Sequence, residues 1–143
     1  MSELIQKSSE NFDAIDKLIE QNLKAPVIHC AYYSSLQLII HYSYEYSKLT
    51  EEEALREVKS KGSHLFYLNI YVKEIRKINA RNASQFYKFF TNFKRKRTEA
   101  DYYNTQIFES DLKQAKKFAQ VIREFIRLIH DEGKCENIYN IKA

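Results

Sequence analysis

Apolar residues recur at spacings of three and four along most of this chain, with charged and amide side chains between them. This period is that of an α-helix that buries one face and exposes the other. The pattern predicts helices around residues 12–19, from Pro26 to about Leu49, from Ser63 to Ile78, over 86–100, and from about Ser110 to just before Gly133.

Capping signals refine the boundaries of these segments. Thr50 and Glu53 form a capping-box pattern, in which the Thr hydroxyl accepts from the amide of Glu53 and the Glu carboxylate reaches back. This pattern predicts a further short helix, which ends near Gly62 because glycine is favoured just past a helix C-terminus. Asn79 and Asn82 predict a break between the two helices on either side of them.

The composition favours an all-helical protein. The 143 residues include two Gly and one Pro, too few for the many turns of a β-sandwich or barrel. This length also suits one domain. We therefore expect an all-α protein, with a helical bundle over residues 1–133 and a C-terminal tail over residues 134–143.

The last predicted helix carries two neighbouring apolar stripes. One consists of Leu112, Ala115, Ala119, Ile122, Ile126 and Ile129, and the other of Phe118, Val121, Phe125 and Leu128. A face this wide exceeds what one helix covers, so we expect it to contact two other helices or a second chain. Because a large uncovered apolar patch is unusual on a monomer, we also expect a homodimer.

Several classes of protein have no support in the sequence. The formal net charge of +4 is low for a protein that coats DNA. Gly62 and Gly133 stand alone, which excludes a glycine-rich phosphate loop and a nucleophile elbow. No two of the four His stand four residues apart, so we expect no metal and no cofactor. Without a signal peptide or a membrane-length apolar run, we expect a cytoplasmic protein that does not contact the membrane.

The basic run 94–97 is the most informative stretch of the chain. Arg97 shares a helical stripe with three phenylalanines, and Asp101 stands one turn further on, within reach of an ion pair. One interpretation is an ordinary ion pair inside the bundle. The other is contact with phosphate or RNA through positive charge and aromatic stacking. The candidate ligand-binding residues are then Lys94, Lys96, Arg97, Asp101 and Tyr102.

Residues 97–102 read Arg-Thr-Glu-Ala-Asp-Tyr. They are similar to the Arg-x-x-Ala-Asp-Tyr signature of one branch of the HEPN superfamily, named for nucleotide binding in higher eukaryotes and prokaryotes. Residues 30–37, Cys-Ala-Tyr-Tyr-Ser-Ser-Leu-Gln, resemble the motif of that family's second helix. The segment that begins Ser63-His64 resembles the opening of its third helix. The resemblance extends from about Phe12 to Ile129.

The resemblance implies an up-and-down antiparallel bundle of four main helices with an additional short helix, usually dimeric. Many members are encoded beside small nucleotidyltransferases, in pairs that resemble toxin–antitoxin systems. The ribonuclease members carry an Arg-x(4–6)-His motif and need no metal. Counted from Arg97, the positions for that His hold Tyr102, Tyr103 and Asn104. The group that would exchange a proton near neutral pH is therefore missing from its usual place.

Three hypotheses of function follow. The first is a non-catalytic module that binds nucleotide or RNA, in which Arg97 engages the ligand and Asp101 orients Arg97. The second is a metal-independent ribonuclease toxin with a rearranged acid–base pair, for which His64, Arg97 and Tyr102 are the candidate catalytic residues. A histidine at the start of a helix, like His64, is also an ordinary core or capping residue. The third is a protein-interaction scaffold in which the signature is structural. The expected partners are a second copy, a nucleotide or RNA, and a nucleotidyltransferase-type protein.

Overall fold

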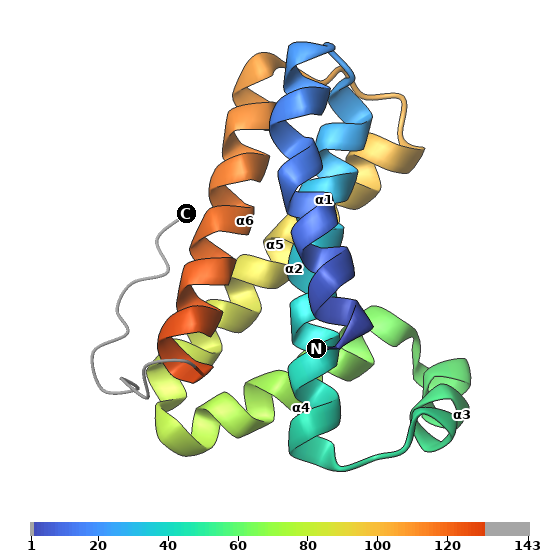
Figure 1. Cartoon of the computed structure of the whole chain (residues 1–143), viewed down its shortest axis with the longest axis vertical. Coiled ribbons are helices and arrows are strands. Elements are labelled where there is room, and N and C mark those ends of the chain that lie inside the picture. The colour runs from blue at the N-terminus through green and yellow to red at the C-terminus, as the bar shows by residue number, and fades with distance from the viewer. Residues whose placement is uncertain (1, 131–143) are drawn as a thin grey trace.

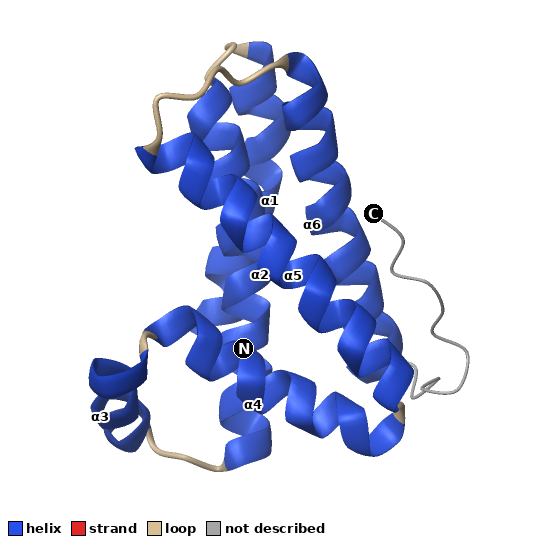
Figure 2. Ribbon diagram, turned by 180° about the vertical axis from the view of Figure 1, so that it is seen from behind, coloured by secondary structure: helices blue, strands red, loops and turns tan. Residues whose placement is uncertain are grey.

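The computed structural model describes residues 2–130, and every regular element in this range is a helix, as predicted (Figure 1). The helices are α1 (Glu3–Glu20), α2 (Lys24–Ser47), α3 (Glu51–Lys61), α4 (Ser63–Ile78), α5 (Ala80–Tyr102) and α6 (Glu109–His130). Figures 1 and 2 show α1, α2 and α6 along the long axis, with α5 crossing them obliquely and α3 to one side.

The helix ends follow the predicted capping signals in most places. The amide of Thr50 donates to Glu53 at 2.8 Å, and the amide of Glu53 donates to Thr50 at 3.2 Å, which completes the capping box. Gly62 separates α3 from α4 with φ of +81°, a conformation that disfavours residues with a Cβ atom. Asn79 forms the break and caps α5. Asn82 was predicted to belong to the break, but it lies buried inside α5.

Helix α2 is the centre of the fold, because it packs against α1, α4, α5 and α6. Small side chains let its neighbours approach closely. The Ser8 hydroxyl of α1 donates to the Ser34 carbonyl, and the Ser43 hydroxyl donates to the Tyr67 carbonyl of α4 at 2.8 Å. Arg123 of α6 in turn donates to the Ser8 hydroxyl at 2.9 Å. Buried polar groups are thus paired where α1 and α4 contact α2 and where α6 contacts α1.

The core between α5 and α6 is aromatic. The ring of Phe86 stacks on Phe125 at a centroid distance of 4.8 Å, and Phe93 stacks on Phe118 at 5.0 Å. Phe86, Phe90 and Phe93 are completely buried, as their shared helical stripe predicts. Offset and edge contacts between such rings stabilise a core beyond the area that they bury.

The first apolar stripe of α6 is buried within the chain, and in the second stripe Phe118 and Phe125 are buried while Val121 and Leu128 are partly buried. The first stripe faces α2, and the phenylalanines of the second pack against α5. The buried members are Leu112, Ala115, Phe118, Ala119, Ile122, Phe125, Ile126 and Ile129. The wide face therefore meets two helices, which is one of the two predicted outcomes. The homodimer stays a prediction.

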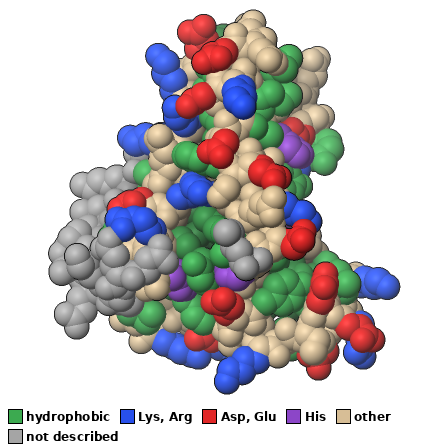
Figure 3. Space-filling model, viewed as in Figure 1, with side chains coloured by type: hydrophobic (Ala, Val, Ile, Leu, Met, Phe, Trp, Pro, Cys, Tyr) green, Lys and Arg blue, Asp and Glu red, His purple; other side chains and the backbone are tan. Residues whose placement is uncertain are grey.

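Two further expectations concern the ends and the surface of the chain. The predicted tail at residues 134–143 lies outside the described residues. Within residues 2–130, no helix is long and apolar enough to cross a membrane. On the face that Figure 3 shows, Lys and Arg side chains are interspersed with Asp and Glu side chains, in keeping with the small net charge.

The aromatic core generates a stability prediction. Phe90 is fully buried and contacts the rings of Tyr32 and Phe86, so Phe90→Ala leaves a cavity and is expected to lower the free energy of unfolding by about 3–5 kcal/mol. Urea denaturation followed by circular dichroism measures this change. Tyr87→Ala on the same helix is the control, because Tyr87 is 37% exposed and its replacement should change stability by less than about 1 kcal/mol. Equal losses in the two variants would contradict the assignment of the core.

Candidate functional site

Arg97 is the buried charge around which the site is organised. Its helical stripe places it among the core phenylalanines of α5, and only 6% of the residue is exposed. Three tyrosine rings surround the guanidinium, with centroids 5.0 Å (Tyr32), 5.5 Å (Tyr33) and 5.8 Å (Tyr102) from its central carbon. These distances are those of cation–π contacts, which gain strength where water is excluded.

The hydrogen bonds of Arg97 are incomplete. One terminal nitrogen donates to Asp101 at 3.4 Å, a long bond for a charged pair. The Nε atom is buried and has no acceptor among the residues that the structure describes. Burial alone would lower the pKa of Arg97, but Tyr33, Tyr32 and Asp101 raise it, so the guanidinium stays charged. A buried charge with an unused donor is energetically unfavourable and rare in folded proteins.

His29 lies on the solvent side of the Arg97–Asp101 pair. Its Nδ1 lies 2.9 Å from the same Asp101 oxygen that Arg97 contacts. Its ring packs on Tyr33 at 4.5 Å, and 48% of its side chain is exposed. This contact could not be predicted from local spacing, because His29 precedes Asp101 by 72 positions. One signal was present: His29 stands one helical turn before Tyr33 and directly precedes the stretch 30–37, which resembles the family's second-helix motif.

His64 reaches the same place from α4. Its Nδ1 makes a 2.8 Å hydrogen bond with the hydroxyl of Tyr32, and its ring lies 5.8 Å from that of Tyr33. Burial, together with the positive charges of Arg97 and Lys94, lowers the pKa of His64 to about 4. His64 is therefore neutral at physiological pH, which makes it a poor general acid in that range.

We call the group His29, Tyr32, Tyr33, His64, Arg97, Asp101 and Tyr102 the Arg97 cluster. It unites residues of α2, α4 and α5, and it includes four of the residues predicted from the sequence: His64, Arg97, Asp101 and Tyr102. Tyr102 is 72% exposed and forms part of the rim. Burial raises the pKa of Tyr32, so this phenol keeps its proton at neutral pH.

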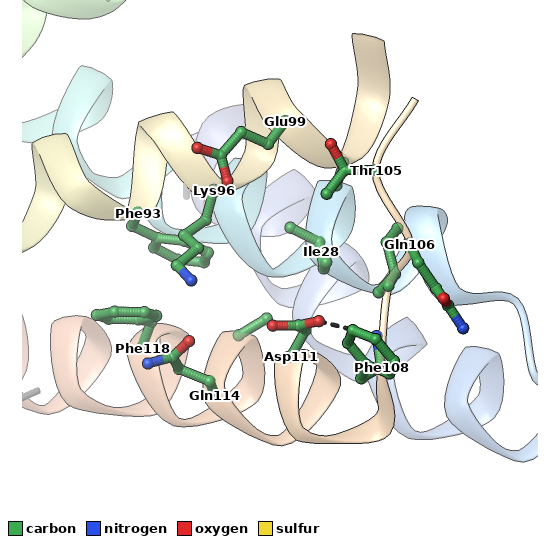
Figure 4. A pocket seen from close by; sticks show the side chains of 13 residues that line it. Ile28, Phe93, Lys96, Glu99, Thr105, Gln106, Phe108, Asp111, Gln114 and Phe118 are labelled. Atoms are coloured by element: carbon green, nitrogen blue, oxygen red, sulfur yellow. Dashed lines mark hydrogen bonds between the residues drawn. The ribbon is translucent and has the colours of Figure 1, made fainter. Parts of the chain in front are cut away.

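The two candidate lysines separate onto different sides of α5. Lys94 is close enough to the cluster to lower the pKa of His64. Lys96 instead lines a pocket between α5 and α6, where Figure 4 shows its side chain beside Phe93. The structure therefore does not bring the whole predicted ligand-binding set together. In residues 2–130, no group of three or more His, Cys, Asp or Glu is arranged to hold a metal ion.

Comparisons with known proteins add no assignment. Models of protein families, curated proteins and solved structures gave no match to this chain. The geometry of the Arg97 cluster and the sequence signature are therefore the basis for the function proposed below.

The low pKa of His64 is directly measurable. In a histidine-selective NMR titration, we expect the His64 ring signals to change with a midpoint near pH 4. Arg97→Met removes a positive charge that disfavours protonation, so it should move the midpoint upwards. Arg95→Met is the matched control, because Arg95 is exposed and points to Asn92 and Glu99. A His64 midpoint near 6.5 in the unmodified protein would contradict the described environment.

Proposed function

We propose that this chain is a non-catalytic HEPN-type module that binds single-stranded RNA, or a nucleotide, at the Arg97 cluster. The single observation that carries the proposal is the buried guanidinium with an unused donor and one long bond to Asp101. A phosphate group supplies several acceptor oxygens that suit the planar fork of an arginine. The ligand would complete a set of hydrogen bonds that the chain leaves unfilled.

The rim of the cluster supports an extended ligand. His29 is half-exposed and Tyr102 largely exposed, so both can contact a ligand directly while Arg97 lies beneath them. Tyrosine rings stack on bases of any sequence, and nearby cations attract the phosphate backbone. Asp101 orients both Arg97 and His29 through one carboxylate oxygen.

The sequence signature places the proposal in a wider setting. We infer that α1, α2, α5 and α6, together with α4 and the short α3, represent the up-and-down helical bundle of the HEPN superfamily. The same resemblance is the basis for proposing a homodimer and a nucleotidyltransferase-type partner. It also favours a two-component system of the toxin–antitoxin kind.

Binding to RNA tests the proposal. In fluorescence anisotropy with a labelled single-stranded RNA, Arg97→Met is expected to weaken binding by about tenfold or more, since a charge-assisted contact is lost. Arg95→Met is again the control, because both substitutions remove one positive charge from α5. General electrostatic attraction would weaken the two variants equally. Equal affinities of these two variants, with circular dichroism spectra like that of the unmodified protein, would contradict the proposal.

A second candidate function is metal-independent cleavage of RNA, and one observation favours it. His29 and Asp101 form a histidine–carboxylate pair beside an arginine. Such a carboxylate holds the imidazole in a fixed orientation. In the cleavage step, a base takes the proton of the 2′-hydroxyl as its oxygen bonds to phosphorus, and the 5′-oxygen leaves with a proton from an acid. His29 is half-exposed and therefore positioned for one of these roles, whereas the low pKa of His64 disfavours it.

The His29→Asn substitution tests the second candidate function through the rate of RNA cleavage. If the chain cleaves RNA, this substitution should lower the rate by about a hundredfold or more, because acid–base catalysis is lost. His41→Asn is the matched control, since His41 also lies on α2 and pairs with a carboxylate, Glu45, at 3.1 Å. Gel assays of labelled RNA without metal ions measure the rates. Absence of cleavage by the unmodified protein would rule out the second function, and absence of RNA binding as well would favour a scaffold.

A further inference from the structure

A pocket of about 250 Å³ lies between α5 and α6 (Figure 4), and Phe93 separates it from Tyr32 of the Arg97 cluster. It is enclosed by α5, the start of α6, and the segment 105–108 that precedes α6, with α2 behind. Its inner walls are apolar and come from Ile28, Phe93, Ala100, Ala115 and Phe118. A cavity of about 150 Å³ holds a benzene ring, and pockets for larger ligands begin at roughly 300 Å³. The pocket therefore fits a ligand with a single ring or with two fused rings.

One positive charge in the pocket has no partner. Lys96 makes no ion pair or hydrogen bond through its ammonium group with any residue in the described range, and Figure 4 shows its side chain extending between α5 and α6. Of the two acidic residues that line the pocket, Glu99 is paired with Arg95 at 2.9 Å. Lys96 is a partly buried residue, and its charge beside apolar walls favours an anionic group on the ligand.

The other acidic residue offers a hydrogen-bond acceptor. Asp111 accepts from the amide of Phe108 at 2.8 Å through one oxygen. Figure 4 shows the second oxygen directed towards the space between the helices. A donor on the ligand, such as a ring N–H, would satisfy this oxygen, whereas an anionic group placed there would be repelled.

We propose that this pocket binds a small aromatic carboxylate that also carries a ring N–H. The ring would lie between the apolar side chains of α5 and α6. The carboxylate would pair with Lys96, and the N–H would donate to Asp111. This assignment is independent of RNA binding, because no residue of the Arg97 cluster lines the pocket.

Indole-3-carboxylate is a suitable probe, because it has the ring, the carboxylate and the N–H. The chain contains no Trp, so indole fluorescence is observed without a tryptophan background. We expect saturable binding at one site per chain in a fluorescence titration. Indole, which lacks the carboxylate, and 1-naphthoate, which lacks the N–H, should each bind more weakly.

Two substitutions assign the polar contacts. Lys96→Met keeps the length of the side chain and removes its charge, and it should weaken binding of indole-3-carboxylate by about tenfold or more. Lys88→Met is the matched control, because Lys88 is an exposed lysine on the same helix. Asp111→Asn should weaken binding of indole-3-carboxylate more than that of 1-naphthoate. No saturable binding of the probe to the unmodified protein, or equal binding to the two lysine variants, would overturn the proposal.

Discussion

A guanidinium buried on the aromatic face of α5 is the constraint on which the rest of the site depends. A charge in such a place needs compensation from several directions at once. Here Tyr32 and Tyr33 come from α2, and Asp101 comes from the next turn of α5. Tyr32, Tyr33 and Asp101 surround Arg97 only while α2 and α5 keep their relative position. The packing of α2 on α5 therefore determines the geometry of the site.

The sequence of α2 meets this requirement by alternating small and large side chains. Ala31, Ser34 and Ser35 are completely buried, and the serine hydroxyls are satisfied by a carbonyl of their own helix. The tyrosines of α2 contact different neighbouring side chains. Tyr32 turns to His64, and Tyr44 contacts Tyr67 at 2.8 Å between hydroxyls. The tyrosines of this helix thus make several separate contacts.

Local features of the fold could be predicted from the sequence, and features that join distant segments could not. The capping box at Thr50 and the apolar stripe of α5 depend on residues within one or two turns. The Arg97–Asp101 pair is equally local, since its partners are four residues apart. His29 is different, because its contact depends on how α2 is rotated against α5. For the same reason, the wide apolar face of α6 left open whether its second neighbour was another helix or another chain.

Helix geometry also explains why the basic run does not act as one surface. Two residues along an α-helix correspond to a rotation of about 200°, so Lys94 and Lys96 must face opposite sides. Lys94 consequently adds to the potential at His64, while Lys96 belongs to the pocket beside α6. Both sides meet where α5 ends: Tyr102 closes the rim of the Arg97 cluster, and the segment that follows it forms a wall of the pocket. The end of α5 thus borders both the Arg97 cluster and the pocket, and its position is the geometric link between them.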